Sequence, residues 1–315
     1  MKTLPRRAFL ASLSGTLVGA AVPTGSMMSR SRPAIAAPQK ARLKAQPLGE
    51  HALLVQGAGC NVLALRDDTG IVFIDGGLKA HGKALLTLAQ KDLNARAAHT
   101  LLNTHWHADH TGLNELLGKQ GARIIAHENT RLWLSTTVRY QPDGPPIGPM
   151  PAGGLPTQTT YSTGELRVGE ETLKYGYLLQ AHTDGDLFVK LTRANVLVTG
   201  GVVAGDAWPT ADWVTGGWIN GTVAGYRALI AQCDDNTRVV TANGARLYTR
   251  ADLVAEADIL SKVADQLGKM MRAGYGPTDM LAANPAKDYA AKLGDPVDFL
   301  TQSFKSLWPR LAPDA

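Results

Sequence analysis

The side chains best suited to chemistry lie in one short run, NTHWHADHTG, at residues 103–112. Four potential metal ligands fall within six positions of this run: His105, His107, Asp109 and His110. In an extended segment, alternate side chains share one face, so His105 and His107 can converge on a single ion. Tetrahedral Zn²⁺ binds neutral imidazole and carboxylate, and a catalytic zinc site keeps one position open for water. The spacing therefore predicts a catalytic zinc site.

Two expected elements position this run. An apolar strand over residues 99–103 leads directly into the histidines, and a helix over residues 113–119 follows them. The alternation of strands with helices along the chain favours sheets that are backed by helices. Further strands are expected over residues 51–55, 61–66, 71–75, 123–126, 165–168, 173–180, 187–192, 196–199 and 238–241, and further helices over 79–93, 129–136, 222–233, 250–273 and within 277–307.

Between residues 140 and 159 this alternation stops. The segment holds six prolines and four glycines, which cannot continue a helix or a central strand. A loop of this length in a compact domain is more often functional or mobile than idle. We expect one or the other here.

With these motifs the chain resembles the metallo-β-lactamase superfamily of hydrolases. The HxHxDH pattern at residues 105–110 is the signature of that superfamily, and Ile74-Asp75-Gly76-Gly77 matches its preceding aspartate–glycine turn. Residues 181–186, AHTDGD, resemble its next motif. The resemblance covers roughly residues 55–249. It implies an α/β (α+β) fold, the four-layer αββα sandwich, followed by a helical C-terminal tail over residues 250–315.

The resemblance also implies a division of the ligands between two metal sites. His105, His107 and His182 would hold the first zinc ion, and Asp109 and His110 would hold the second. Asp75 would brace the metal-binding loop rather than bind metal.

Two positions depart from the family pattern, and both belong to the second site. Gly201 stands where the family has an aspartate that bridges the metals, and Asn243 stands where it has its last histidine. None of the eight histidines follows position 182. The second site keeps Asp109 and His110, with at best a weak amide oxygen from Asn243. We therefore expect one tightly bound Zn²⁺ and a second site that is weak or absent.

These ligands predict a zinc-dependent hydrolase, and the N-terminal segment discussed below predicts that it is exported. Three imidazoles leave Zn²⁺ doubly positive, so the pKa of a bound water falls to about 7. The resulting hydroxide would attack a small ester, lactone, thioester or cyclic amide. Asp109 is the candidate general base, and His110 is its neighbour and proton relay.

Three alternatives stay open. A non-catalytic periplasmic binding or accessory protein would keep the fold while losing second-site ligands. A β-lactamase is compatible with Gly201, because metallo-β-lactamases proper do not use the bridging aspartate, but they keep the last histidine that Asn243 replaces. A redox di-iron protein would need two complete metal sites.

The N-terminus predicts export. Arg6 and Arg7 precede a short apolar run, and Ala34-Ile35-Ala36 resembles a signal-peptidase site. The pattern resembles a twin-arginine signal, which is read by the machinery that exports folded proteins. We expect a signal peptide over residues 1–36 cleaved near Ala36 or Ala37, a linker over 37–50, a metallo-β-lactamase-like domain over 51–315, and a periplasmic mature protein.

Charge and cysteine content limit the partners. Residues 1–36 carry five basic residues and no acidic one, and the remaining chain has 27 residues of each sign. This balance gives no reason to expect a nucleic acid, and the composition gives none for stable membrane insertion of the mature chain. A small-molecule substrate is the expected partner. Cys60 and Cys233, the only two cysteines, are either buried free thiols or a periplasmic disulfide.

Overall fold

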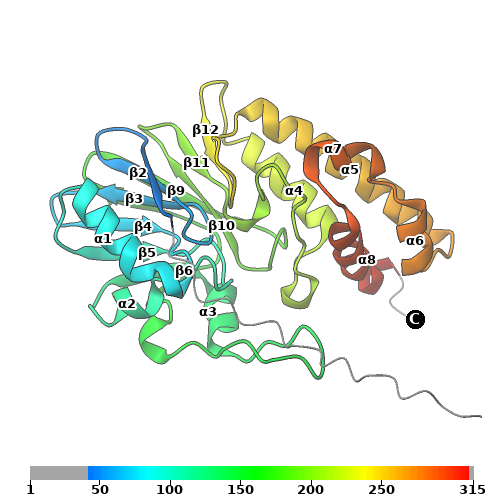
Figure 1. Cartoon of the computed structure of the whole chain (residues 1–315), viewed down its shortest axis with the longest axis horizontal. Helices are drawn as coiled ribbons and strands as arrows, with labels where there is room; N and C mark the ends of the chain where they lie inside the picture. Colours follow the sequence, from blue (N-terminus) through cyan, green and yellow to red (C-terminus); the bar gives the residue numbers. More distant parts are fainter. Residues whose placement is uncertain (1–41, 312–315) are drawn as a thin grey trace, which may run out of the picture. The chain divides into compact units, whose positions relative to one another are not determined.

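Two β-sheets carry the fold of the chain (Figure 1), which the computed structural model describes from residue 42 to residue 311. The first sheet has the strand order β1-β2-β3-β4-β5-β6-β7, and the second has the order β12-β11-β10-β9-β8. The expected signal peptide and its cleavage site lie outside the described residues.

The first sheet changes direction at its centre. Strands β1 to β4 pair antiparallel, and β4 to β7 pair parallel. The carboxyl ends of its parallel strands therefore lie along one edge, where loops can bring side chains together. Its strands are β1 (Lys44–Pro47), β2 (Ala52–Gln56), β3 (Val62–Arg66), β4 (Ile71–Ile74), β5 (Ala98–Leu102), β6 (Arg123–His127) and β7 (Gln158–Thr160).

The second sheet is antiparallel except at one end. Strands β8 to β11 form an antiparallel run, and β12 joins β11 in parallel. Its strands are β8 (Thr163–Val168), β9 (Glu171–Leu178), β10 (Asp186–Leu191), β11 (Val196–Val198) and β12 (Arg238–Val240). The α-helices are α1 (Gly82–Asp92), α2 (Asn114–Gly118), α3 (Glu128–Ser135), α4 (Ile219–Ile230), α5 (Arg250–Arg272), α6 (Pro277–Ala283), α7 (Ala290–Leu293) and α8 (Val297–Leu311).

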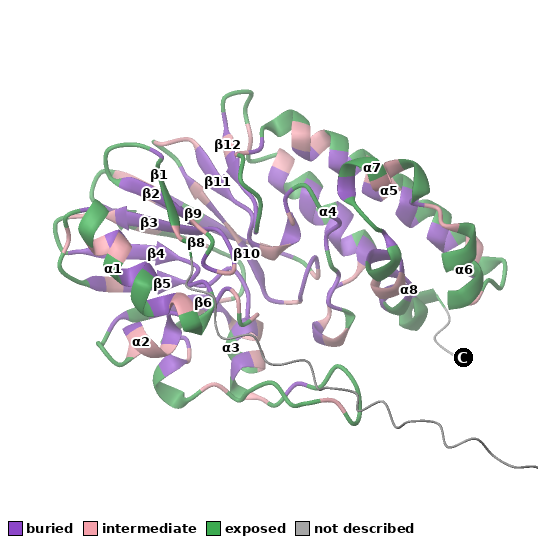
Figure 2. Cartoon of the chain, viewed as in Figure 1, coloured by how far each residue is buried: buried purple, intermediate pink, exposed green. Residues whose placement is uncertain are grey.

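The apolar side chains form layers because the central strands are buried on both faces (Figure 2). In β2, Leu53 and Val55 share a cluster with Leu85 of α1, whereas Leu54 shares one with Val189 of the second sheet. A third cluster joins the second sheet to helices α4, α5, α6 and α8. The order helix, sheet, sheet, helix is the expected four-layer sandwich, and the helical C-terminal region is present.

The sequence analysis did not predict two edge strands, β1 and β7. Residues 44–47, part of the expected linker, form β1 and pair with β2, and residues 158–160 form β7 within the expected loop. Both strands are short and largely polar, and the residues of β1 are exposed. An edge strand needs little apolar patterning and tolerates proline, so its sequence resembles a loop.

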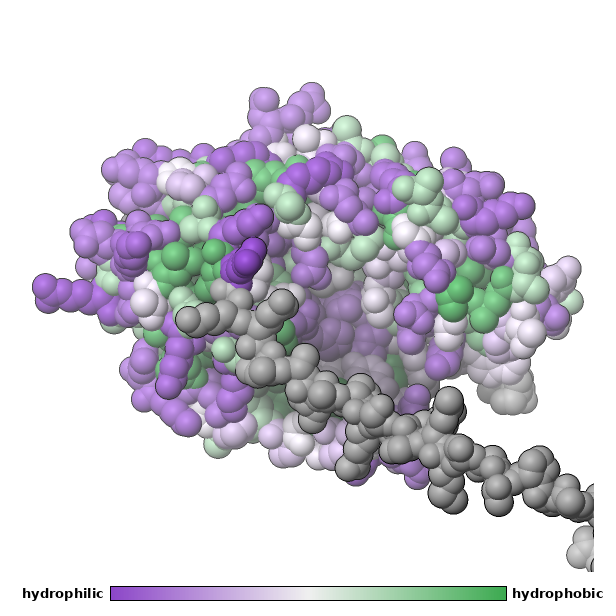
Figure 3. Space-filling model, in the orientation of Figure 1, coloured by the Kyte–Doolittle hydropathy of each residue, from purple (hydrophilic) through white to green (hydrophobic). Residues whose placement is uncertain are grey.

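The C-terminal helices follow local signals. Thr249 and Asp252 form a capping box at the start of α5, which matches the helix expected over 250–273. The helical stretch expected within 277–307 is divided into α6, α7 and α8, with Gly294 and Pro296 between the last two. Among the described residues, no helix combines the length and the apolar character needed to cross a bilayer. The face drawn in Figure 3 shows apolar residues in separate patches among hydrophilic ones.

Candidate metal centre

The histidine-rich loop is fixed at its start by Asp75, which follows β4. The Thr104 backbone N–H donates to Asp75 Oδ1 at 2.8 Å, and the Thr104 hydroxyl donates to Oδ2 at 2.8 Å. Asp75 is fully buried and has a φ of 62°, in the left-handed region that non-glycine residues rarely adopt. The carboxylate therefore holds the loop onto the end of β4, which confirms the bracing role expected for Asp75.

At the other end of the loop, glycines allow two backbone segments to approach closely and to hydrogen-bond. Gly112 N–H donates to the Gly77 carbonyl at 2.7 Å, and Gly76 N–H donates to the His110 carbonyl at 2.6 Å. A Cβ at Gly112 would lie 2.3 Å from the Gly77 oxygen, so no larger residue fits this approach.

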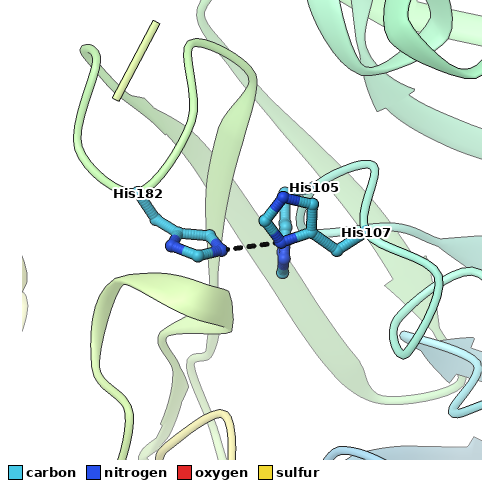
Figure 4. A group of neighbouring side chains, drawn as sticks. All are labelled: His105, His107 and His182. Carbon is cyan, nitrogen blue, oxygen red and sulfur yellow. Dashed lines mark hydrogen bonds between the residues drawn. The ribbon is translucent and has the colours of Figure 1, made fainter. Parts of the chain in front are cut away.

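His105, His107 and His182 come together at one point, and we call this group the tri-histidine centre (Figure 4). Each ring offers one ligand nitrogen, and these nitrogens lie within 4.8 Å of one another. His105 and His107 come from the loop after β5, whereas His182 comes from the turn between β9 and β10 in the second sheet. The centre therefore joins the two sheets, as the resemblance implied for these three residues.

The outward nitrogen of each ring is held by a protein group, which fixes the tautomer. His182 Nδ1 donates to the Thr210 carbonyl at 2.6 Å, and His107 Nε2 donates to Asp212 Oδ2 at 2.9 Å. His105 Nδ1 lies 3.1 Å from the Thr104 hydroxyl, whose proton goes to Asp75. A neutral ring held in this way gives its one proton outward, so its inward nitrogen carries a lone pair.

The inward nitrogens lie close together. His107 Nδ1 and His182 Nε2 are within hydrogen-bonding distance, 2.9 Å apart (Figure 4), and buried His105 Nε2 has no hydrogen-bond partner among the described residues. Buried nitrogen lone pairs this close repel unless a proton or a metal ion lies between them. Neutral imidazoles oriented by outer hydrogen bonds are typical of a transition-metal site. The residues present thus fit a zinc ion.

The surroundings keep two of these imidazoles, His105 and His182, uncharged. Burial, reinforced by the neighbouring imidazoles, lowers the pKa of His105 well below its usual value. Burial and the adjacent His107 lower the pKa of His182 to about 3. Both rings are therefore neutral at pH 7 and ready to bind a metal.

Asp212 and Tyr140 lie beside the tri-histidine centre, and the sequence analysis did not identify either of them as part of the site. Asp212 is buried and accepts hydrogen bonds from His107, from the Tyr140 hydroxyl at 2.8 Å and from the Thr215 hydroxyl at 2.6 Å. Burial raises the pKa of Asp212, but these hydrogen bonds outweigh it and hold the pKa below its usual value. Tyr140 stands at the start of the proline-rich segment, so this segment contributes to the site. A single aspartate gave no sequence signal for this role.

His110 and Asp109 lie beside the tri-histidine centre rather than within it. The His110 ring is 4.1 Å from the His105 ring, and its Nδ1 donates to Asp75 at 2.8 Å. Asp109 has a side chain that is 39% exposed, and one of its oxygens is 3.6 Å from His110 Nε2. Burial lowers the pKa of His110, but nearby Cys60 and Asp75 reverse this and hold the pKa well above its usual value. This side of the site favours positive charge.

Comparison with known proteins identifies the family. A sequence model of the metallo-beta-lactamase superfamily matches residues 55–243, which is more than half of the chain. The chain belongs to the metallo-beta-lactamase superfamily. Among solved structures, a metallo-beta-lactamase from Pontibacter korlensis has a TM-score of 0.57 at 18% identity, with 70% of this chain and 99% of that chain covered. The sec-alkylsulfatase Pisa1 from Pseudomonas sp. has a TM-score of 0.63 at 15% identity, with 87% of this chain and 51% of that chain covered.

One curated relative shares part of the sequence. The 2,4-dinitroanisole O-demethylase subunit alpha of Nocardioides sp. (strain JS1661) is 27% identical over 128 residues. The match takes in 39% of this chain and 34% of that protein, so the chain spans about a third of this relative's length.

The structure gives a reason for one departure from the superfamily pattern. A Cβ at Gly201 would lie 2.3 Å from His182 Cδ2 and 2.9 Å from His105 Cε1. The imidazoles therefore occupy the space that the family's bridging aspartate would need. Asn243 lies exposed in the loop after β12. Asp206 pairs with Arg246 at 3.1 Å and is in neither group of potential metal ligands among the described residues.

Both cysteines are free thiols, which decides between the two states considered for them. Cys60 is buried in the loop between β2 and β3, and Cys233 is half-buried after α4. Neither of the two aspartates after His182 is hydrogen-bonded to its ring. Asp186 accepts from the backbone N–H groups of His182 and Thr183, and Asp184 accepts from the indole of Trp133, so both shape the turn.

Proposed function

We propose that this protein is an exported zinc-dependent hydrolase that cleaves a small ester, lactone, thioester or cyclic amide. The observation that carries the proposal is the tri-histidine centre, where one nitrogen from each of three rings converges and each ring is held from outside. A relic of the fold would have no need to keep three imidazoles directed at one point.

The site combines a place for the ion with a group for the proton. Zinc held by the three histidines would act as a Lewis acid and lower the pKa of a bound water to about 7. Asp109 is partly exposed beside the centre, so its carboxylate can receive a proton from the attacking water and pass it to the leaving group. His110, 3.6 Å from Asp109 and held by Asp75, keeps a positive charge next to that carboxylate.

A substrate panel with two variants tests the proposal. Asp109→Asn should lower turnover about 100-fold, the usual scale for a positioned base, while one equivalent of zinc stays bound. His182→Ala should lose that zinc, because two imidazoles make a poor site for a four-coordinate ion. Turnover and zinc content are measured on the same preparations, each checked for folding by circular dichroism.

The panel should span the proposed carbonyl substrates and two further classes. A β-lactam covers the β-lactamase alternative. A dinitroaryl methyl ether is included because the Nocardioides relative is named for O-demethylation of 2,4-dinitroanisole. If the wild type turns over none of these and Asp109→Asn leaves the binding of compounds unchanged, a non-catalytic periplasmic binding or accessory protein becomes the better description.

Export is the remaining part of the proposal. It is supported by Arg6 and Arg7 ahead of an apolar run, which lie outside the described residues. A folded-protein export route would suit a chain that acquires its metal before leaving the cytoplasm.

A further inference from the structure

The tri-histidine centre is open to solvent on the side of His107 and Asp109. His105, His110 and His182 are buried, whereas the His107 side chain is 20% exposed and the Asp109 side chain is 39% exposed. A substrate that reaches an ion in the centre therefore approaches from the side of these two residues. Other side chains at this open side are able to contact the substrate.

Tyr140 lies at this open side. Its hydroxyl donates to Asp212 Oδ2 at 2.8 Å and is 3.4 Å from His107 Nε2. Burial of the hydroxyl and the charge of Asp212 raise the pKa of Tyr140, and the charge of Asp109 raises it further, so Tyr140 lies within electrostatic range of both carboxylates. Although its hydroxyl is held, Tyr140 is 42% exposed. Its ring is therefore a fixed apolar surface beside the open side.

The proline-rich segment holds Tyr140 in place. Val138 and Trp106 share a buried apolar cluster, against which Met150 packs. Val138 and Ile147 exchange two backbone hydrogen bonds of 2.9 Å, which close the chain around residues 139–146. Three of these eight residues are prolines, which limit the conformations open to the turn. Little further entropy is lost when a ligand packs on the Tyr140 ring.

A fixed and exposed aromatic ring favours a ligand that carries a flat ring of its own. Small-molecule sites are lined mainly by apolar and aromatic side chains, and stacked or edge-to-face rings gain affinity beyond the area that they bury. The phenol of Tyr140 donates to a carboxylate, and this polarisation leaves its ring richer in electrons. An electron-poor aryl group is the best partner for such a ring.

We propose that Tyr140 is a specificity residue and that the substrate carries an aryl group, which packs on the Tyr140 ring while the scissile carbonyl reaches the tri-histidine centre. The inference rests on the proposed function. It narrows the substrates to aryl esters and to lactones, thioesters or cyclic amides with an aryl substituent. It also gives the proline-rich segment a role in substrate selection.

Two zinc-binding probes test the aryl site without turnover. Benzohydroxamate and cyclohexanecarbohydroxamate share one chelating group and have rings of similar size, but only the first ring is aromatic. The zinc-loaded, full-length wild type should bind benzohydroxamate about 5-fold more tightly in isothermal titration calorimetry, which is within the range for an aromatic pair. The cyclohexyl ring is at least as apolar, so burial alone cannot produce this preference.

Three variants assign the preference to one ring. Tyr140→Phe should keep the preference because it keeps the ring, and Tyr140→Ala should lose it. Both variants lack the hydrogen bond to Asp212, so their comparison separates the ring from the hydroxyl. Tyr275→Ala is the matched control, since Tyr275 is 44% exposed in the turn between α5 and α6, and it should bind both probes as the wild type does. The zinc content of each preparation is measured before the titration.

The outcomes separate this proposal from the proposed function. Equal affinity of the wild type for the two probes, a preference that survives Tyr140→Ala, or a preference lost in Tyr140→Phe would overturn the aryl site. The first of these results needs no variant, so it holds even if Tyr140→Ala fails to fold. A preference for the aryl probe in a chain that hydrolyses no member of the substrate panel would refute the proposed function and leave the aryl site standing.

Discussion

The orientation of each imidazole in the tri-histidine centre depends on one outward hydrogen bond. The hydrogen-bond partner is the Thr104 hydroxyl for His105, the Asp212 carboxylate for His107 and the Thr210 carbonyl for His182. A ring free to turn would present a proton to the ion in some of its orientations. The outer partners are therefore expected to set metal affinity although they do not touch the metal.

Asp212→Asn tests this at the partner of His107. The amide keeps the shape but removes the negative charge that fixes the His107 Nε2 proton, so we expect zinc affinity to fall about 10- to 100-fold. Competition with a chromophoric chelator measures the affinity. Tyr140→Phe, which removes one of the hydrogen bonds to Asp212, should have a smaller effect, and equal losses in both variants would contradict the explanation.

Gly201 is the second residue that can be tested singly. A Cβ there would lie 2.3 Å from the His182 ring, so Gly201→Ala should displace the ring and weaken zinc binding. Overpacking of this kind costs about 1–3 kcal/mol of unfolding free energy. Gly153→Ala is the matched control, because a Cβ at Gly153 meets nothing within 4 Å. Denaturant unfolding and zinc competition on both variants provide the comparison.

At the scale of elements, the helical C-terminal region is attached to the sandwich by a buried acid. Glu256 of α5 accepts hydrogen bonds from the hydroxyls of Tyr226 in α4, at 3.0 Å, and of Tyr248, at 2.8 Å. Burial raises the pKa of Glu256 above its usual value in spite of these hydrogen bonds. The folded state therefore favours the protonated carboxyl.

This shift predicts a pH dependence of stability. The stabilisation from protonated Glu256 is fully present below the ordinary value of 4.5 and is lost as the pH rises through the raised folded-state pKa. It amounts to about 1.4 kcal/mol for each pH unit between the two values. Glu256→Gln should gain stability relative to wild type as the pH rises from 4.5 to 8, with Glu50→Gln, an exposed carboxylate, as control. A difference in melting temperature that does not change with pH would contradict the assignment.

At the scale of the whole molecule, the tri-histidine centre requires both sheets. His105 and His107 follow β5 of the first sheet, and His182 and Asp212 belong to the part of the chain that builds the second. The centre therefore forms only when the sandwich has folded. The proposed export of the folded chain would therefore carry an assembled tri-histidine centre.

Replacement of Arg6 and Arg7 by lysine tests that route. The twin-arginine machinery reads the arginine pair, so the double variant should stay in the cytoplasm as an uncleaved precursor. Cell fractionation followed by immunoblotting measures the distribution. Undiminished export of the double variant would indicate a different pathway.

The sequence alone was sufficient for the features encoded by neighbouring residues. The HxHxDH run, the strand before it and the aspartate–glycine turn lie close together in the chain, and their resemblance to the family pattern predicted the fold, the convergence of His105 and His107 and the bracing role of Asp75. Central strands were also predictable, because burial on both faces requires continuous apolar runs. The edge strands β1 and β7 carry no such pattern, since one side of each needs no partner.

Only the tertiary structure decided which distant residues complete the site. Asp212 is 105 positions from its hydrogen-bond partner His107, and Tyr140 reaches it from a proline-rich segment. Cys60 comes from the β2–β3 loop to lie beside Asp75 and His110. The need for glycine at position 201 is visible only from the imidazoles that fill the space beside it. A single cysteine, glycine or aspartate has no periodicity that could reveal a contact. Its role depends on which chain segments the packing of two sheets brings together.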